Sequence, residues 1–380
     1  MKDLFLGLFS GFVSIGWKEI VMYLIGLVLI YLAIKKEYEP MLLLPIGFGC
    51  ILINLPFAVA WELEGDPGFL QVLYNSGIKN ELFPILIFIG VGAMIDFTPL
   101  FKNPVMMFFG AAAQFGIFAT MLAAIALKFD LPVAAAIGII GAADGPTAIY
   151  VGNKFAQEHF AAISVAAYSY MSLVPIIQPP VIRLCTTRKE RLIRMDYHEE
   201  PVPRITKIIF PIAITLIAGI LVPNSVPLVG SLMFGNLIRE CGVLERLSQA
   251  AQNELANLVT LVLGITIGAT MKANQFLTID TILILALGLV AFVFDTAGGV
   301  FFAKFVNLFL KKKINPMVGG AGISAFPMSA RVIQKMAQKE DPTNFVLMQA
   351  VSANVSGQLG SIVAGGVILT LIPLLTGIGG

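Results

Sequence analysis

The sequence predicts an all-α polytopic membrane protein made of two related halves, each with a broken helix near the membrane centre. Three observations support this class. Of the 380 residues, 57% are hydrophobic and only 13% are charged, whereas an ordinary soluble domain has about a quarter charged residues. Long apolar runs recur along the whole chain, and similar interrupted segments occur in both halves. The net charge of +2 is too small to indicate a nucleic-acid partner.

A helix needs roughly 20 apolar residues to cross a bilayer, and several segments approach this length. They lie at about 20–34, 41–60, 103–127, 160–182, 206–222, 274–303 and 342–374. Shorter or broken segments lie at about 82–96, 131–153, 226–238, 256–271 and 314–337. Glycine, proline or polar residues interrupt the short segments. Irregular backbone at membrane depth is tolerated only where protein or a water-filled cavity covers it, so these segments are the first candidates for a site.

A charged segment from 183 to 207 separates the two halves. It is rich in arginine and lysine and contains prolines, so the positive-inside rule places it in the cytoplasm, together with Lys35–Lys36 and Lys311–Lys313. The acidic stretch Trp61–Gly68 is expected to face outward. We therefore divide the chain into a first membrane repeat, a cytoplasmic linker and a second membrane repeat, at residues 1–182, 183–207 and 208–380.

The cysteines argue against a disulfide or zinc framework, and the N-terminal run argues against a cleaved signal peptide. The cysteines Cys50, Cys185 and Cys241 are far apart without a CxxC pair, which indicates neither a disulfide framework nor a zinc site. The N-terminal run MKDLFLGLFSGF has no small-residue cleavage site, so we interpret it as a retained amphipathic segment.

The halves align at several points. Gly92 can be placed on Gly268 with an offset of 176, and Pro146 on Pro327 with an offset of 181. A slowly drifting offset is typical of duplication followed by small insertions. Weak internal symmetry with broken segments at matching places indicates a transporter site at the midplane. The alternative is chance similarity between stretches rich in glycine and alanine.

Asp144 is the strongest candidate for chemistry. It is the only charged residue from Leu131 to Asn153, and a carboxylate at the centre of a membrane helix costs about 3 kcal/mol. Gly145 and Pro146 come directly after it and open the helix, since proline removes a backbone donor. A carboxylate beside free carbonyls suits Na⁺ or a proton. The alternative is a carboxylate paired with a neighbouring helix for packing alone.

The matching stretch of the second half runs from Ile314 to Arg331. The glycine-rich run Gly319–Gly322 is unsuited to a helix interior, and Pro327 interrupts the next helical turn, so we expect a hairpin of two half-helices. Asn315 and Gly319 are spaced i, i+4, and Ser324 and Arg331 are spaced i, i+7, so each pair can share a helix face. Asn315 and Ser324 offer neutral oxygens. Arg331 offers a positive charge for an anion, or else reaches the headgroups at the interface.

Further candidates lie in three other spans and are ranked lower or left open. Asn354 stands in a polar stretch of the longest uncharged run, where it either ligates an ion with Asp144 or belongs to a small-residue helix interface. Tyr168 and Tyr170 either relay a proton or anchor the helix at the interface. Asp295 is a second lone acid, ranked lower because it could reach the membrane interface.

At these residues the sequence resembles a known family. The motifs are GAADGPTAIYVGNKFA, AAYSYMSLVPIIQPP, GNLIRECGVLERLSQAAQNEL, GISAFPMSARVIQK and NVSGQLGSIVAGGV. They resemble the β subunit of the Na⁺-translocating biotin-dependent decarboxylases, which act on oxaloacetate, methylmalonyl-CoA or glutaconyl-CoA. The resemblance implies a subunit that decarboxylates carboxybiotin, consumes a proton and exports Na⁺ from the cytoplasm. It also implies an elevator-type fold with inverted repeats, a moving core and a scaffold.

The resemblance also implies roles for particular residues. The family's essential aspartate matches Asp144, and its implicated tyrosine matches Tyr170. The residues implied in cation binding or carboxybiotin contact are Asn315, Gly319, Ser324, Arg331 and Asn354. Na⁺ is expected at Asp144 and Asn354, and carboxybiotin near Arg331 and Ser324. The compact chain is more similar to the acyl-CoA decarboxylases than to the longer oxaloacetate type.

The expected partners are a carboxyltransferase α subunit, a biotin carrier γ subunit and a small single-span subunit, in an oligomer in the bacterial cytoplasmic membrane. Carboxybiotin is expected on the separate carrier, since this chain has no MKM biotin-attachment motif. A secondary transporter that exchanges Na⁺ for H⁺ or carries an organic anion is the alternative from another class. A passive membrane anchor is a third, but it explains neither Asp144 nor Arg331.

Overall fold

The structure of the protein is a computed structural model that describes residues 11, 14–63, 65–195 and 201–377. Within these ranges, seven helices are long and apolar enough to cross a membrane, and one bent pair adds a further candidate span. The predicted class, an all-α polytopic membrane protein, is confirmed. The N-terminal segment that we interpret as retained lies mostly outside the described residues.

One group of helices, here called the first bundle, is built around α3 and α5. Its members are α2 (Trp17–Lys36), α3 (Pro40–Ile53), α4 (Phe69–Leu73), α5 (Leu82–Met94), α13 (Arg204–Leu221), α14 (Val226–Glu240), α15 (Glu245–Ala250) and α16 (Ala256–Ala269). α3 packs against α2 and α16, and α5 packs against α14. Small residues permit this proximity, since a Cβ on Gly49 would stand 2.3 Å from the carbonyl oxygen of Ile265. Only 6% of the most apolar part of α13 is buried within the protein, so its remaining surface is available to lipid.

A second group of helices, here called the second bundle, surrounds α18 and α20. Its members are α7 (Met107–Ala113), α8 (Phe115–Ala126), α9 (Leu131–Gly138), α10 (Gly145–Phe155), α11 (Phe160–Cys185), α18 (Ile279–Phe309), α19 (Met328–Glu340) and α20 (Leu347–Thr376). α18 packs against α11 and α8, and α20 packs against α7 and α19. Each half of the chain therefore contributes helices to both bundles.

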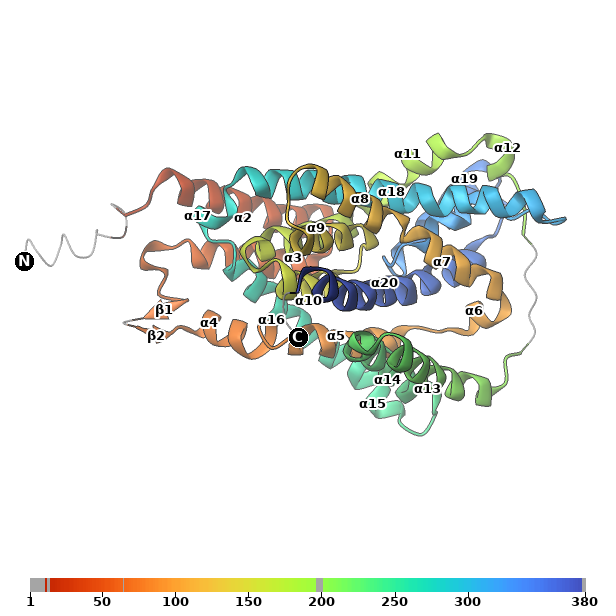
Figure 1. Ribbon diagram of the computed structural model, residues 1–380, viewed down its shortest axis with the longest axis horizontal. Helices are drawn as coiled ribbons and strands as arrows, with labels where there is room; N and C mark the ends of the chain where they lie inside the picture. Colours follow the sequence, from red (N-terminus) through yellow and green to blue (C-terminus); the bar gives the residue numbers. More distant parts are fainter. Residues whose placement is uncertain (1–10, 12–13, 64, 196–200, 378–380) are drawn as a thin grey trace, which may run out of the picture.

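The molecule has two distinct ends (Figure 1). At one end lie α6 (Thr98–Lys102), α12 (Arg188–Arg191), α19 and the last turns of α18, and we call this the linker end. At the opposite end lie the antiparallel pair β1 (Glu62–Leu63) and β2 (Asp66–Pro67), and α17 (Ala273–Phe276). Lys18 near the start of α2 donates to Asn274 in α17, so α2 runs from the opposite end toward the linker end. The turn that joins α2 to α3 is therefore on the linker side.

Two interrupted segments enter the second bundle from opposite ends. The first hairpin consists of α9, the 3₁₀ segment η4 (Ile139–Ala142), a break at Ala143 and Asp144, and α10. The second hairpin consists of the 3₁₀ segment η8 (Pro316–Gly322), an extended break at 323–327, and α19. The two predicted broken segments thus have the same order, a 3₁₀ turn before the break and an α-helix after it.

The second hairpin differs from its predicted form in one respect. Gly319–Gly322 do not interrupt the structure but lie inside η8. Because glycine has no side chain, this segment can pack closely against α18. A Cβ on Gly319 would stand 2.1 Å from the carbonyl oxygen of Gly299 in α18. The break comes later, at Ile323–Pro327, and separates Ser324 from Arg331, so these two residues do not share a helix face.

The boundaries of two other segments also differ from the prediction. α11 extends to Cys185 and α13 begins at Arg204, so the connection between the halves is shorter than 183–207 and contains the short helix α12. The predicted span 41–60 is helical only as far as Ile53, beyond which Pro56 begins a 3₁₀ turn. Proline lacks the amide hydrogen that a continuing helix requires.

Candidate functional site

The Asp144 carboxylate is buried in the second bundle, where its side chain is 3% exposed. Its Oδ2 atom accepts hydrogen bonds from the Thr147 hydroxyl at 2.8 Å, the Gln358 amide at 3.0 Å and the Ser361 hydroxyl at 2.8 Å. Gln358 and Ser361 belong to α20, so the carboxylate joins the first hairpin to the last helix. Three donors on one oxygen offset part of the cost of burying a charged carboxylate.

The local backbone explains why the carboxylate points into the protein. Ala143 has a left-handed conformation with φ of 53°, and Asp144 is extended and occupies the N-cap position of α10. Its Oδ1 atom accepts from the Thr147 backbone amide at 3.4 Å. Free amides and the positive end of the helix dipole favour a carboxylate at this position. Gly145 is required because a Cβ there would stand 2.2 Å from the Tyr168 ring.

The second hairpin brings its break to the same place. The Ser324 amide donates to the carbonyl oxygen of Ala142 at 3.0 Å, and the Ser324 hydroxyl donates to the carbonyl oxygen of Gly357 at 3.0 Å. Asn354, one helical turn before Gln358 on α20, donates to the Ile323 carbonyl at 2.6 Å. Its Oδ1 atom is buried and has no hydrogen-bond partner among the described residues. Asp144, Ser324 and Asn354 are thus gathered around one point of α20.

A cavity of about 240 Å³ opens beside Asp144, between the two bundles. The second bundle contributes Asp144, Tyr168, Ser324 and Gln358 to its wall. The first bundle contributes the start of α3, the end of α5 and the start of α16, with Glu39, Met94 and Asn257 among the lining residues. The turn before α3 is on the linker side, and α5 ends just before α6 at the linker end, so these residues line the cavity on its linker side.

The two candidate tyrosines point in different directions. Tyr168 lines the cavity, and its buried hydroxyl has no partner in the part of the chain that the structure describes. The Tyr170 hydroxyl instead donates to the Leu285 carbonyl of α18. Alternate residues of a helix lie on different faces, so only one of the two can face Asp144. The structure places Tyr168 beside Asp144 and Tyr170, the tyrosine implied by the resemblance, against α18.

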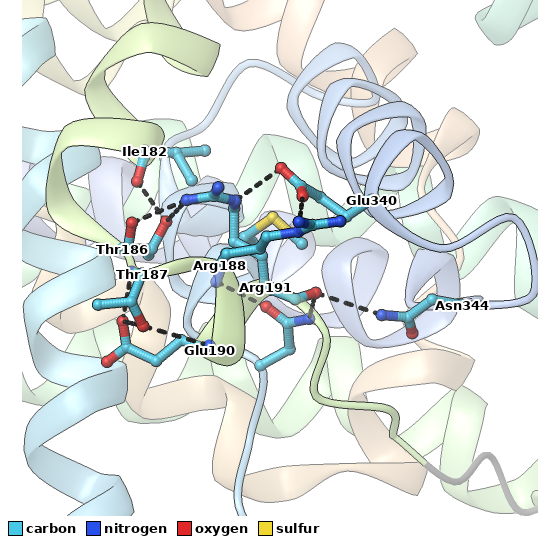
Figure 2. A network of polar contacts seen from close by, with 10 residues as sticks. Ile182, Thr186, Thr187, Arg188, Glu190, Arg191, Glu340 and Asn344 are labelled. Carbon is cyan, nitrogen blue, oxygen red and sulfur yellow. Dashed lines mark hydrogen bonds and ion pairs between the residues drawn. The ribbon is translucent and has the colours of Figure 1, made fainter.

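Asn315 lies at the linker end and not beside Asp144. Its amide donates to the carbonyl oxygens of Arg191 and Ile193, both at 2.9 Å, and its Oδ1 accepts from the Met317 amide at 3.1 Å. Figure 2 shows the network that these contacts join: Arg191 donates to the Glu340 carboxylate at 2.8 Å and to the Thr186 carbonyl at 2.8 Å. The nitrogen of the Asn315 side chain thus holds the linker to the second hairpin, while its oxygen caps η8.

Arg331 and Asp295 are placed differently from Asp144. Arg331 is exposed on the first turns of α19, on the same face as Lys335. Asp295 is 1% exposed in the middle of α18, so the expectation that it could reach the membrane interface is wrong. Its carboxylate is enclosed by two glycines, since a Cβ on Gly116 or Gly141 would stand 2.4 or 2.6 Å from its oxygens.

Thr147, Gln358 and Ser361 are absent from the site predicted from the sequence, although each contacts the Asp144 carboxylate. Two signals in the sequence pointed to them. Thr147 stands three residues after an N-cap aspartate, where a capping interaction is expected. Gln358 and Ser361 come after Asn354 at i+4 and i+7, the spacing of one helix face.

The gathered groups are hard oxygen ligands and hydrogen-bond donors. One carboxylate, a free amide oxygen at Asn354 and the Ser324 hydroxyl suit a monovalent hard cation or a proton. Among the described residues, no group of three or more His, Cys, Asp or Glu side chains could hold a metal ion. The arrangement suits reversible cation binding because its oxygens come from one carboxylate, one amide and one hydroxyl.

Comparison with known proteins identifies the family. A family model described as the Na⁺-transporting oxaloacetate decarboxylase β subunit matches residues 18–372. The chain is 51% identical to the glutaconyl-CoA decarboxylase subunit β of Acidaminococcus fermentans over 363 residues, which cover 96% of each chain. It is 50% identical to the methylmalonyl-CoA decarboxylase subunit β of Veillonella parvula, covering 96% of this chain and 95% of that one. It is 44% identical to the oxaloacetate decarboxylase β chain 2 of Salmonella typhi, covering 95% and 97%.

Proposed function

Since this chain belongs to the family of Na⁺-transporting oxaloacetate decarboxylase β subunits, we propose that Asp144 is the carboxylate through which it couples decarboxylation to Na⁺ export. The observation that carries the proposal is the position of Asp144: buried, held by three donors, and at the inner end of a cavity between two bundles. A buried acid that can be neutralised by either Na⁺ or H⁺ can exchange one for the other.

The chemistry on the biotin side consumes one proton. Cleavage of the bond between the carboxylate carbon and the ureido nitrogen of carboxybiotin releases CO₂, and the nitrogen takes up the proton. Carboxybiotin is presented from the linker end by a separate carrier subunit, and Arg331, exposed on α19, contacts its carboxylate. The cation is held by Asp144, by Ser324 at the break of the second hairpin, and by Asn354 on α20.

The two hairpins and the two bundles favour an inverted-repeat, elevator-type transporter. The hairpins have the same internal order and enter from opposite ends, as expected for repeats of inverted topology. The first bundle is then the scaffold, and the second bundle, which carries Asp144, is the moving core. In the present arrangement the first bundle lines the cavity on its linker side, which is the cytoplasmic side by the positive-inside rule. The protein then resides in a bacterial cytoplasmic membrane with carboxyltransferase, biotin carrier and small single-span subunits.

Reconstitution of the complex in liposomes tests the proposal. Decarboxylation of glutaconyl-CoA, methylmalonyl-CoA and oxaloacetate is measured together with uptake of ²²Na⁺, for the wild type, Asp144→Asn and Asp130→Asn. Asp130 is the exposed aspartate at the start of the same hairpin and serves as the matched control. We expect Asp144→Asn to abolish both activities and Asp130→Asn to retain them. Normal Na⁺ uptake by Asp144→Asn would refute the assignment.

Avidin separates the proposal from a transporter without covalent chemistry. Avidin that sequesters the biotin of the carrier should stop Na⁺ uptake, whereas Na⁺ uptake that continues would indicate the alternative. For Arg331, the variant Arg331→Met should weaken use of the carrier-bound substrate, and Lys335→Met, one turn further on the same exposed face, should not. If Arg331→Met loses Na⁺ binding but still decarboxylates free carboxybiotin, the docking role is wrong.

A further inference from the structure

A second carboxylate, Glu39, lines the cavity that contains Asp144. It belongs to the first bundle, in the turn between Lys36 at the end of α2 and Pro40 at the start of α3. Its side chain is half-buried, and burial raises the pKa of its carboxyl group. Glu37, two residues earlier in the same turn, is exposed and does not line this cavity. The cavity therefore has an acid at its inner end and another at the linker side.

The Tyr168 hydroxyl lies within the electrostatic reach of both acids. The charges of Asp144 and Glu39 both act on it. The side chain of Tyr168 is 2% exposed, and its hydroxyl oxygen has no hydrogen-bond partner among the described residues. A buried hydroxyl without a partner is costly, and this one belongs to a residue that lines the cavity between two carboxylates. A cation that enters the cavity between Glu39 and Asp144 would supply the missing partner.

We propose that Glu39 and the Tyr168 hydroxyl form a capture site for Na⁺ on the linker side of the cavity, from which the cation passes to Asp144. Asn257 and Thr260 of α16 line the same cavity and add neutral oxygens. A cleft lined by negative charge raises the local concentration of cations and their rate of association. The inference rests on the proposed function, and it adds a residue of the scaffold to the cation pathway.

The position of Glu39 on the first bundle has a consequence for coupling. Asp144 belongs to the second bundle, so movement of the core against the scaffold would separate the two carboxylates. Glu39 would then act only while the cavity leads to the linker end. It would raise the occupancy of the Asp144 site by cytoplasmic Na⁺ without taking part in release on the other side.

The test measures how ²²Na⁺ uptake by the reconstituted complex depends on Na⁺ concentration. For Glu39→Gln we expect the half-saturating Na⁺ concentration to rise about five- to tenfold, with a maximal rate within about twofold of wild type. Glu37→Gln is the matched control and should behave as wild type. Glu39→Asp retains the charge and should recover most of the affinity. The elution profile of the purified complex confirms that each variant is assembled.

Ionic strength provides a second readout that a merely structural role would not produce. Added choline chloride screens the carboxylate without supplying Na⁺, so the difference between wild type and Glu39→Gln should shrink as choline increases. The inference is overturned if Glu39→Gln and Glu37→Gln have the same Na⁺ dependence. Failure of the proposed function is distinguishable, because it would appear as normal uptake by Asp144→Asn.

Discussion

The Ser324 backbone amide donates a hydrogen bond of 3.0 Å to the carbonyl oxygen of Ala142, and this bond joins the breaks of the two hairpins. Ala142 ends the 3₁₀ segment that precedes Asp144, and Ser324 comes just after the 3₁₀ segment of the second hairpin. A broken helix leaves backbone groups unpaired, and here each break supplies a partner for the other. The geometry around Asp144 therefore depends on both halves of the chain.

Removal of a donor to Asp144 should weaken cation binding without abolishing transport. Ser361→Ala deletes the 2.8 Å hydrogen bond to Oδ2 but leaves Thr147 and Gln358 in place. The loss of one hydrogen bond to a charged group corresponds to about 1.5–3 kcal/mol, or roughly a tenfold or greater change in half-saturating Na⁺ concentration. Thr370→Ala, which removes a hydroxyl bonded within the same helix, should leave the Na⁺ dependence unchanged. Equal Na⁺ dependence of the two variants would contradict this prediction.

A side chain at Gly357 should disrupt the meeting of the second hairpin with α20. A Cβ at this position would stand 2.1 Å from the carbonyl oxygen of Gly322, so the hairpin would have to shift. We expect Gly357→Ala to lower the thermal stability of the purified complex, by about 1–3 kcal/mol in free energy of unfolding, and to lose Na⁺ uptake. The control is Gly230→Ala on α14, where the nearest atoms are 3.8 Å from the added Cβ. If Gly357→Ala takes up Na⁺ as the wild type does, the close contact between Gly357 and Gly322 is refuted.

The two tyrosines should respond differently to loss of the hydroxyl. Tyr168→Phe removes the unpartnered hydroxyl of a residue that lines the cavity and should change the Na⁺ concentration dependence of uptake. Tyr170→Phe removes the hydroxyl that donates to the Leu285 carbonyl, which should lower stability by about 1 kcal/mol with an unchanged half-saturating Na⁺ concentration. Thermal unfolding and ²²Na⁺ uptake of both variants separate these effects. A shifted Na⁺ dependence in Tyr170→Phe alone would restore Tyr170 as the residue that acts on the cation.

The linker should detach from the second hairpin when Arg191 is replaced. The Arg191 guanidinium is mostly buried and contacts both Glu340 and Thr186 (Figure 2). Arg188 is 77% exposed and stands 3.8 Å from the same glutamate, and exposed pairs contribute little. Hydrogen–deuterium exchange over residues 186–195 should therefore accelerate in Arg191→Ala and remain unchanged in Arg188→Ala. Similar exchange in both variants would show that the buried pair does not hold the linker.

The contact between Arg194 and Asp341 should persist in mild acid. Hydrogen bonds from the Thr343 hydroxyl and amide, and then from Arg194, lower the pKa of Asp341 to about 2. A carboxyl group whose pKa is lowered by folding stabilises the structure above its unfolded pKa, and this stabilisation is lost as the pH falls through the folded value. Exchange of residues 192–195 should thus be faster in Asp341→Asn than in wild type at both pH 7 and pH 4. If the two proteins already exchange equally at pH 4, the lowered pKa is wrong.

The sequence could identify the candidate residues but could not arrange them. Asp144 was identifiable because an isolated charge in an apolar run is costly, and the adjacent Gly145 and Pro146 located the break. Asn315 offered the same evidence of a polar residue before a glycine-rich break, yet its side chain binds linker carbonyls. Nothing in the local pattern distinguishes an amide that contacts a cation from one that contacts a neighbouring backbone.

Hydropathy and helix breakers act over short stretches of chain, so the sequence alone predicts the membrane class, the interrupted segments and the lone acid at Asp144. The folded structure is needed to show which groups surround that acid. Ser361 is 217 residues from Asp144 in the sequence and donates to its carboxylate, while Tyr168 and Tyr170 are two residues apart and face different helices. Such contacts depend on how helices pack across the bundles, which no local periodicity specifies.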